Sequence, residues 1–300
     1  MKQKAITLVE WQNRFHDELA CIEHITEIRW QEGFCCPHCG GTEAWYTPGH
    51  ALYDCKSCRK RTSVTSGTLF HSTKLPLTSW FVAIYFCAVD KGGISATRLQ
   101  AYIDVSWNTA RLMLAKIRKA MGERDQMYLL QGLIELDDAL IGGKTTGGKR
   151  GRGSEKKTSI LVACEHDAEH NQAGYLKMQV VENVDEKAVS QFAQESFVEK
   201  QDIRTDGSST LKTLEKQEHR VESKVIPPQQ THKWLPWVHI AIANLKRFLL
   251  GTYHGVSGGR LQEYMDEFCY RFNRRRWVLE IPNRLLNACL LHKPILRLAF

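Results

Sequence analysis

The chain has 300 residues, 43% hydrophobic and 25% charged, with a formal net charge of +8. This length can bury the cores of two or three domains, and the positive charge favours a polyanionic partner, the plain alternative being a basic protein with no such partner. No signal peptide opens the chain and the longest apolar run, residues 80–89, is too short to span a bilayer, so we expect no membrane association and a cytoplasmic location. The ten cysteines then indicate metal ligands or reduced thiols rather than disulfides.

The N-terminal segment begins with a capping box, Thr7-Leu-Val-Glu10, in which two side chains satisfy the free N–H groups of a helix start. Apolar residues at helical spacing, Trp11, Phe15, Leu19 and Ile22, predict one amphipathic helix. A second, shorter helical piece is expected to run through Trp30 before Gly33.

Two CxxC pairs follow, with fifteen residues between them. Four thiolates at this spacing can hold one tetrahedral Zn²⁺, and the segment between the pairs can form the hairpin of a zinc ribbon. A redox role for one pair would not explain the presence of the second. The predicted zinc ligands are Cys36, Cys39, Cys55 and Cys58; Cys35, His38 and His50 are the neighbours that this closed shell does not need.

Residues 76–121 read as helices separated by short turns, expected at 80–89, 96–102 and 107–121. A short helix, a tight turn and a longer basic helix form the outline of a helix-turn-helix, with an ordinary helical hairpin as the alternative. On the longer helix, Asn108, Arg111, Lys116 and Arg118 are candidates to face DNA.

The stretch from Leu133 to Lys144 predicts a strand around which the rest of the chain is organised. Its alternation of apolar and polar residues is that of a half-buried strand, with Asp137 on the face opposite Ile134 and Leu136. A carboxylate is costly in a strand unless it binds something, so Asp137 is the better metal-ligand candidate and Asp138 the poorer one. The alternative is a solvated sheet edge.

A glycine-rich basic loop follows the strand but lacks the order of a phosphate-binding motif. Its residues Lys149, Arg150 and Arg152 suit contacts with a nucleic-acid backbone. Downstream, strands are expected at 159–164, 175–182, 202–206 and 221–226, helices at 185–198 and 208–217, and two closing helices at 237–253 and 260–275. The basic run 271–276 suits phosphates, or is simply a solvated helix end.

Three antiparallel strands, a helix and a fourth strand follow the order of a ribonuclease-H-like fold, which places an acid on its first strand beside an acid ending its fourth. Those acids are Asp137 and Asp206. Further matching pieces are Gly33-Phe-Cys-Cys-Pro-His-Cys39, Thr65-Ser-Gly-Thr68, Gly142-Gly-Lys144, Thr205-Asp-Gly207, Leu245-Lys-Arg247, Gly251-Thr-Tyr-His254, Glu267-Phe268 and Arg271-Phe-Asn273. From residue 8 to 280, the chain resembles bacterial insertion-sequence transposases of the DDE class that carry an N-terminal zinc ribbon (family fifteen-ninety-five, the ISXO-like group).

The resemblance implies a multidomain α+β protein: an N-terminal helical segment (1–33), a zinc ribbon (34–72), a helix-turn-helix-like DNA-binding domain (73–128) and a ribonuclease-H-like catalytic domain with C-terminal helices (129–300). The family places Glu or Asn seven positions before a Lys as its third active-site residue. Counting back from Lys246 gives His239, and seven residues turn a helix by roughly 700°, so the two share a face. The implied catalytic set is therefore Asp137, Asp206, His239 and Lys246, with His239 either a ligand or only a hydrogen-bonding residue.

By the same resemblance, Asp137, Asp206 and His239 hold two Mg²⁺ or Mn²⁺ ions, and Lys246 and Arg247 contact DNA. The implied reaction is cleavage at terminal inverted repeats and joining of the 3′-hydroxyl to target DNA. The implied partners are double-stranded DNA at transposon ends and target, in a homodimer or higher oligomer at the nucleoid. Two alternatives are a metal-dependent nuclease or resolvase without strand transfer, and a zinc-ribbon DNA-binding regulator with a decayed catalytic domain.

Overall fold

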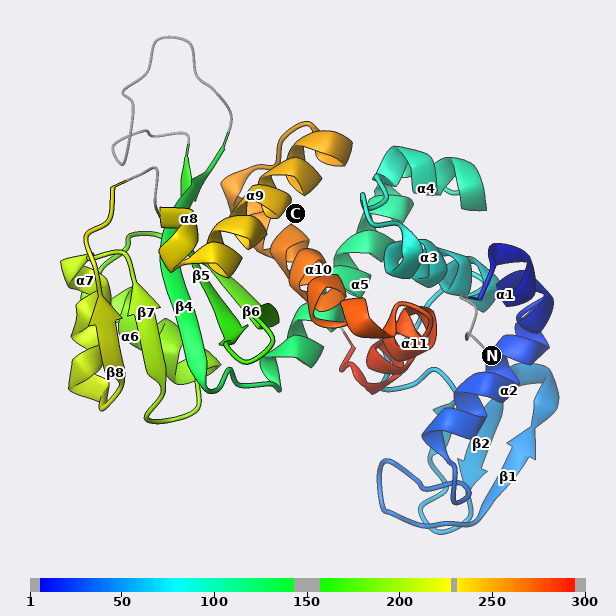
Figure 1. The fold of residues 1–300 in the computed structure, drawn as a ribbon. Helices are drawn as coiled ribbons and strands as arrows, with labels where there is room; N and C mark the ends of the chain where they lie inside the picture. The colour runs from blue at the N-terminus through cyan, green and yellow to red at the C-terminus, as the bar shows by residue number, and fades with distance from the viewer. Residues whose placement is uncertain (1–5, 143–156, 228–230, 295–300) are drawn as a thin grey trace. The chain divides into compact units, whose positions relative to one another are not determined.

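The structure, a computed structural model, describes residues 6–142, 157–227 and 231–294 (Figure 1). The chain divides into two compact units, Met1–Met121 with Trp277–Phe300, and Gly122–Arg276. Among the described residues, no helix combines the length and apolarity needed to cross a membrane. The predicted DNA contacts Lys149, Arg150 and Arg152 lie outside the described residues.

The first unit begins with two helices, α1 (Leu8–Arg14) and α2 (Glu18–Arg29). The capping box is confirmed, because the Thr7 hydroxyl accepts from the Glu10 N–H and the Glu10 carboxylate accepts from the Thr7 N–H. The first helix was expected to continue through Leu19 and Ile22, which is wrong, because it ends at Arg14. The Asp17 carboxylate accepts from the Ala20 N–H at 2.8 Å and starts a new helix, which leaves Leu19 53% exposed.

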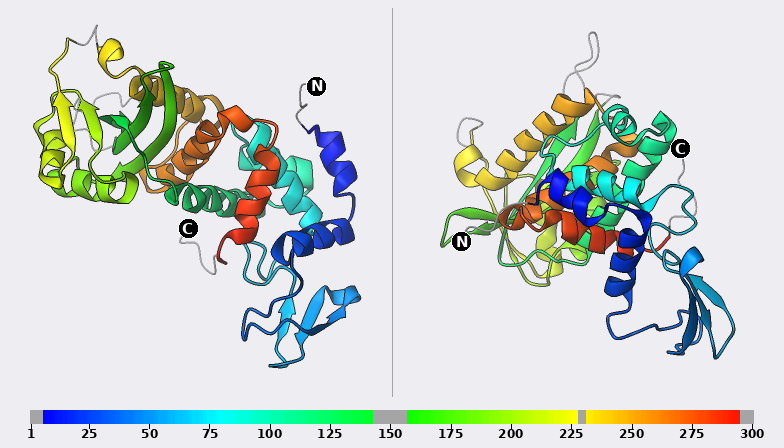
Figure 2. Two further views of the ribbon diagram at one scale, coloured as in Figure 1. Left: turned by 60° about the horizontal axis from the view of Figure 1, so that its bottom comes forward. Right: turned by 90° about the vertical axis from the view of Figure 1, so that its right-hand side faces the viewer.

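The ribbon that follows α2 is a three-stranded antiparallel sheet of β1 (Ala44–Thr47), β2 (Leu52–Cys55) and β3 (Arg61–Ser63), in the order β1-β2-β3 (Figure 2). Aromatic rings gather around β2. Phe34 stacks on Tyr53 with ring centroids 4.8 Å apart, and Trp30 meets the same ring edge-on at 4.7 Å. The hairpin expected between the cysteine pairs is present, and the sequence analysis did not foresee β3.

The helices α3 (Leu77–Val89), α4 (Ala96–Ile103) and α5 (Trp107–Gln126) correspond to the three that the sequence predicts. Asp104, in the left-handed region at φ 49°, ends α4, and α5 starts three residues later. Helix α11 (Ile281–Leu291) was not predicted from the sequence, and its segment was expected in the catalytic domain. It packs instead on α3, and the Cys289 carbonyl accepts from the Leu69 N–H at 3.1 Å.

The second unit is built on a five-stranded sheet of β4 (Leu133–Ile141), β5 (Thr158–Asp167), β6 (Gln172–Val181), β7 (Asp202–Thr205) and β8 (Arg220–Ser223). The strand order is β6-β5-β4-β7-β8; β4, β5 and β6 are antiparallel, and β7 and β8 run parallel to β4. This is the ribonuclease-H-like topology that the sequence order predicts. The strand β4 lies at the centre.

Helices cover both faces of this sheet (Figure 1). On one face, α6 (Glu186–Ser196) brings Phe192 against Ile134 and Leu136, with α7 (Ser209–Lys212) beside it. On the other, α8 (Thr231–Trp234), α9 (Pro236–Tyr253) and α10 (Leu261–Asn273) cover Ala139 and Ile141. The expectation that β4 is half buried is therefore wrong, since alternate residues of a central strand enter two different cores.

The outer edge of β6 is closed by two amide side chains of α10. Asn273 both accepts from the Leu176 N–H (2.7 Å) and donates to the Leu176 carbonyl (3.0 Å). Gln262 accepts from the Val180 N–H (2.9 Å) and donates to the Met178 carbonyl (3.2 Å). These bonds take the place of a neighbouring strand and protect an edge that would otherwise pair with another chain.

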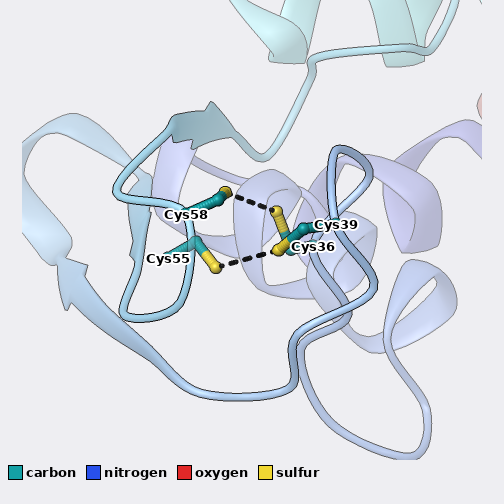
Figure 3. Close-up of side chains that lie close together, drawn as sticks. All are labelled: Cys36, Cys39, Cys55 and Cys58. Carbon is teal, nitrogen blue, oxygen red and sulfur yellow. Dashed lines mark hydrogen bonds between the residues drawn. The ribbon is translucent and has the colours of Figure 1, made fainter.

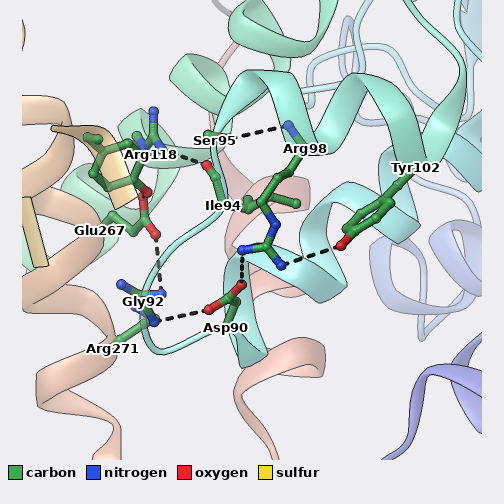
Figure 4. Close-up of polar contacts among 10 residues, drawn as sticks. Asp90, Gly92, Ile94, Ser95, Arg98, Tyr102, Arg118, Glu267 and Arg271 are labelled. Carbon is green, nitrogen blue, oxygen red and sulfur yellow. Dashed lines mark hydrogen bonds and ion pairs between the residues drawn. The ribbon is translucent and has the colours of Figure 1, made fainter. Parts of the chain in front are cut away.

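The basic run 271–276 was interpreted as a phosphate-binding cluster, and two of its members are wrong for that role. Arg274 is buried and lies 2.6 Å from the Asp125 carboxylate, while the Arg275 guanidinium donates to the backbone carbonyls of Ala173 and Gly174. Arg271 pairs with Glu267 one turn earlier on α10 at 3.2 Å (Figure 4). Arg274 and Arg275 therefore fasten the end of α10 to its own unit.

The half-buried carboxylate of Asp266 on α10 predicts how the stability of the protein depends on pH. Burial raises the pKa of Asp266 from its ordinary value of 3.8 to about 7, although Gln262 donates to it at 2.8 Å. The folded chain then binds more protons than the unfolded chain between these values, so the free energy of unfolding falls as pH rises through this window. Asp266→Asn, which keeps an acceptor for Gln262, should raise Tm by a few degrees above pH 7 and change little below pH 3.8.

The measurement is thermal unfolding across pH, with Glu199→Gln as the control that removes the same charge from an exposed position. An Asp266→Asn protein with the wild-type pH dependence would contradict the prediction.

Candidate active site

The centre of the candidate site is the face of β4 that meets α9. Asp137 is 7% exposed, and its Oδ2 lies 3.8 Å from Nε2 of His239 on α9. Its Oδ1 accepts from the Asp138 backbone N–H at 2.8 Å. The alternation of the strand sends Asp138 to the opposite face. Asp137 and His239, two of the predicted ligands, are thus brought together by strand and helix.

Asp206 follows the last residue of β7. The parallel pairing of β4 with β7 matches Leu133 to Asp202 and Glu135 to Arg204 and ends there. The expectation that Asp206 lies beside Asp137 therefore stays a prediction. Its Oδ1 accepts from the Ser208 N–H at 3.1 Å. Gly207 makes this turn at φ +92°, where an added Cβ would come within 2.7 Å of Val225.

Lys246 lies two turns beyond His239 on the same face of α9, and both line a hollow of about 410 Å³. Asp137, Asp138 and Lys157 line it too, whereas Asp206 does not. In the part of the chain that the structure describes, only the ribbon cysteines bring three or more metal-ligating side chains within 4.8 Å of one another. The set Asp137, Asp206 and His239 remains a prediction as a metal site.

A buried acidic residue that the sequence analysis passed over lies two positions before Asp137. The carboxylate of Glu135 accepts from the backbone N–H groups of Trp237 and Val238, at 2.8 and 2.9 Å. Its other oxygen lies 2.8 Å from Nδ1 of His166, though the two are not aligned for a straight hydrogen bond. Burial raises the pKa of Glu135 to about 7, against the lowering effect of the two N–H groups and of Arg204. The signal in the sequence that could have found Glu135 is its position two residues before Asp137, which puts both carboxylates on the same face of β4.

The tip of β7 is held by an indole. Trp234 donates from Nε1 to the Thr205 carbonyl at 3.0 Å, and the Arg204 guanidinium and the Lys224 ammonium lie 4.9 and 3.9 Å from the centroid of its ring. The carbonyl that precedes Asp206 is therefore tied to the segment leading into α9. Nothing in the sequence pattern singled out this tryptophan.

The four predicted zinc ligands converge in the ribbon (Figure 3). Their sulfur atoms lie close in pairs, with Cys36 3.7 Å from Cys58 and Cys39 3.6 Å from Cys55. Backbone N–H groups of the second knuckle, first that of Cys58, lower the pKa of Cys55 to about 6, which favours the thiolate that zinc binds. The donor set, its spacing and its charge fit one tetrahedral zinc ion. The spare thiol of Cys35 is exposed.

Polar contacts hold helix α4, the first helix of the predicted helix-turn-helix (Figure 4). Ser95 caps α4 by accepting from the Arg98 N–H (3.2 Å), and the Arg98 guanidinium bridges Asp90 and Tyr102. Of the predicted DNA contacts on α5, Asn108 is exposed and Arg111 half buried, and both stay predictions.

Two basic residues of α5 are more buried than the sequence suggested, and of these Lys116 stays a predicted DNA contact. The Lys116 ammonium lies 6.0 Å from the Trp80 ring centroid, and burial lowers its pKa. Arg118 is 3% exposed and donates to the Ile94 carbonyl, so its predicted place on the DNA-facing side is wrong. The exposed residues Lys246 and Arg247 of α9 remain predicted contacts.

The second unit thus has a ribonuclease-H-like sheet with an acid on its central strand, and the first unit carries a ribbon with four clustered cysteines. Residues 129–273 match the family described as ISXO2-like transposase domain, and residues 16–61 match the transposase zinc-ribbon domain of the same group, so the two matches span well over half of the chain. The chain belongs to the IS1595 family of transposases.

A curated relative is the uncharacterized protein in transposable element ISH50 of Halobacterium salinarum. It is 23% identical over 278 residues, which cover 86% of this chain and 91% of the relative. Among solved structures, a pre-cleavage Mos1 transpososome shares 10% identity and a TM-score of 0.28, over 69% of this chain and 76% of that chain. A Mos1 paired-end complex with the left transposon end shares 13% identity and a TM-score of 0.26, over 70% and 77%. Likeness at this level carries no argument here.

Proposed function

We propose that this transposase binds the terminal inverted repeats of its insertion sequence, cleaves the ends and joins their 3′-hydroxyls to target DNA. The observation that carries the proposal is the meeting of β4 and α9. The buried Asp137 lies 3.8 Å from His239, and Lys246 lines the same hollow two helical turns further on. Acid, imidazole and ammonium from two elements of one unit face one surface hollow.

The chemistry follows from the kinds of groups present. Carboxylates of Asp137 and Asp206 suit hard divalent cations, and two Mg²⁺ or Mn²⁺ ions, when bound, would activate the attacking hydroxyl and stabilise the leaving oxygen of a phosphodiester. His239 would add a neutral nitrogen ligand. Lys246, exposed at the rim, would bind a DNA phosphate as a point charge and orient the strand.

The DNA-binding surface is proposed from charge and exposure. The net charge of +8 favours association with duplex DNA, and Asn108, Lys246 and Arg247 present exposed polar or basic side chains. Since one reaction must pair two transposon ends, we propose that the working species on DNA is a homodimer or a higher oligomer.

His239 supplies the test that is specific to this chain. A neutral imidazole in place of a carboxylate leaves one less negative charge near the metals and favours Mn²⁺, which accepts mixed nitrogen and oxygen shells more readily than Mg²⁺. We expect a higher Mn²⁺-to-Mg²⁺ ratio of end-cleavage rates for the wild type than for His239→Glu, and severe loss in both metals for His239→Ala.

The measurement is cleavage of a duplex carrying the sequences that flank the gene, across a series of both metals. His170→Ala is the control, because His170 is exposed on the β5–β6 turn and pairs with Asp167. Full activity and unchanged metal preference in His239→Ala would remove His239 from the ligand set.

A further inference from the structure

The helix that carries His239 and Lys246 begins without a cap of its own. Its N-cap residue is Leu235, which has no side-chain acceptor, and Pro236 follows at the first helical position. The next backbone N–H groups, those of Trp237 and Val238, need acceptors because the first turn of a helix has no intrahelical partners for them. Sequence-local capping by Ser, Thr, Asp or Asn, which starts α1, α2, α4 and α6, is absent at this helix.

The acceptor comes from the sheet. Glu135, fully buried on β4, accepts both N–H groups with one carboxylate oxygen, at 2.8 and 2.9 Å. A negative charge at this position also interacts favourably with the positive end of the helix. The second oxygen lies 2.8 Å from His166 on β5, and Arg204 on the paired strand β7 adds a positive charge nearby. The carboxylate is therefore held from the sheet and from the helix together.

The contact between Glu135 and the start of α9 lies next to the candidate site on both the strand and the helix. On β4, Glu135 and Asp137 are two residues apart and share the face toward α9. On α9, Val238 is followed directly by His239. Because Glu135 holds the start of α9, it also sets the distance between Nε2 of His239 and Oδ2 of Asp137, which is 3.8 Å.

We propose that Glu135 is a positioning residue, which docks the start of α9 on the central strand and thereby sets the His239–Asp137 geometry that a divalent cation requires. The proposal rests on the proposed function, because it assigns a metal to that pair. Partners that orient metal ligands from behind commonly contribute about 10- to 100-fold to metal affinity.

The same unit offers a matched control. Glu165 is also a carboxylate that accepts from two backbone N–H groups, those of Gln131 (3.0 Å) and Tyr175 (2.8 Å), and burial raises its pKa as well. It supports the β5–β6 hairpin and the start of β4, and it contacts no residue of α9 among its hydrogen bonds. Its loss should cost stability without touching the His239–Asp137 pair.

The experiment compares the full-length wild type with Glu135→Ala, Glu135→Leu, Glu135→Gln, Glu165→Ala and Asp137→Ala. Two readouts are taken: hydrogen exchange of the amides in residues 237–241, and the affinity for Mn²⁺ alone by titration calorimetry. The two acceptor-free Glu135 variants should expose these amides to faster exchange and weaken Mn²⁺ binding about 10- to 100-fold. Glu135→Gln, which keeps an acceptor oxygen but not the charge, should recover part of both, and Glu165→Ala should lower Tm and leave both unchanged.

A folded Glu135→Ala or Glu135→Leu protein with wild-type Mn²⁺ affinity would overturn the proposal, and so would a Glu165→Ala protein with an equal loss. If neither acceptor-free variant folds, Glu135→Gln decides, and wild-type Mn²⁺ affinity in that variant counts against positioning. A wild type whose Mn²⁺ binding does not depend on Asp137 would overturn the proposed function, and the metal part of this proposal with it. Amide exchange would still show whether Glu135 holds α9.

Discussion

Asp137→Ala is expected to abolish cleavage of transposon-end DNA while the protein still binds that DNA. The carboxylate is buried on the central strand and lies 3.8 Å from His239, so we expect no neighbouring side chain to take its place. The loss should exceed the roughly 100-fold that follows removal of an outer-shell partner, because a group in contact with the metal is lost. Removing a negative charge next to a phosphate should leave DNA binding equal or tighter.

The control removes the same charge from a position outside the hollow. Glu169 is exposed on the β5–β6 turn and does not line the hollow, so Glu169→Gln should keep most of the activity. Cleavage rates and DNA dissociation constants of both variants, measured side by side, decide the matter. Full cleavage by Asp137→Ala, or equal loss in both variants, would refute the assignment.

Removing zinc should unfold the ribbon and spare the ribonuclease-H-like unit. The ribbon holds only three short strands and a small aromatic cluster, so the metal must supply much of its folding free energy. Cys36→Ser or Cys55→Ser should therefore take the zinc content from one ion per chain to none and weaken binding of end DNA. The sheet of β4 to β8 has its own two cores and should keep its unfolding transition.

Cys35→Ser separates the loss of a ligand from the loss of a thiol, because Cys35 is exposed and its sulfur lies outside the four-sulfur cluster. That variant should keep its zinc and its affinity for DNA. Metal analysis with DNA-binding titration tests both. A zinc-free wild type that binds its ends normally would contradict the prediction.

The elements with strong local signals were predictable. The capping box at Thr7 and the CxxC pairs each depend on residues close in sequence, and each has the expected structure. The strand around Asp137 is also present, but the alternation did not show that it is buried on both faces. The split between α1 and α2 was missed because Asp17, an ordinary polar residue on a helical pattern, turned out to be a cap.

Features that depend on distant partners could not be predicted in this way. Glu135 is recognisable as a helix cap only when residues more than a hundred positions away fold beside it, and Leu235-Pro236 gives no local sign of where its cap lies. Similarly, Arg118 and Arg274 look like surface charges until burial shows what they contact. Long-range ion pairs have no period in the sequence.

The most direct test of the central claim is a strand-transfer assay on a pre-cleaved end. Duplexes ending in the sequence that flanks the gene, with either a 3′-hydroxyl or a 3′-deoxy terminus, are incubated with a supercoiled target plasmid, Mn²⁺ and the wild-type protein. Our account predicts plasmid joined covalently to the 3′-hydroxyl duplex, none with the 3′-deoxy duplex, and none with Asp137→Ala. Nicking of DNA without any joined product would contradict it and would assign the chain to metal-dependent nucleases instead.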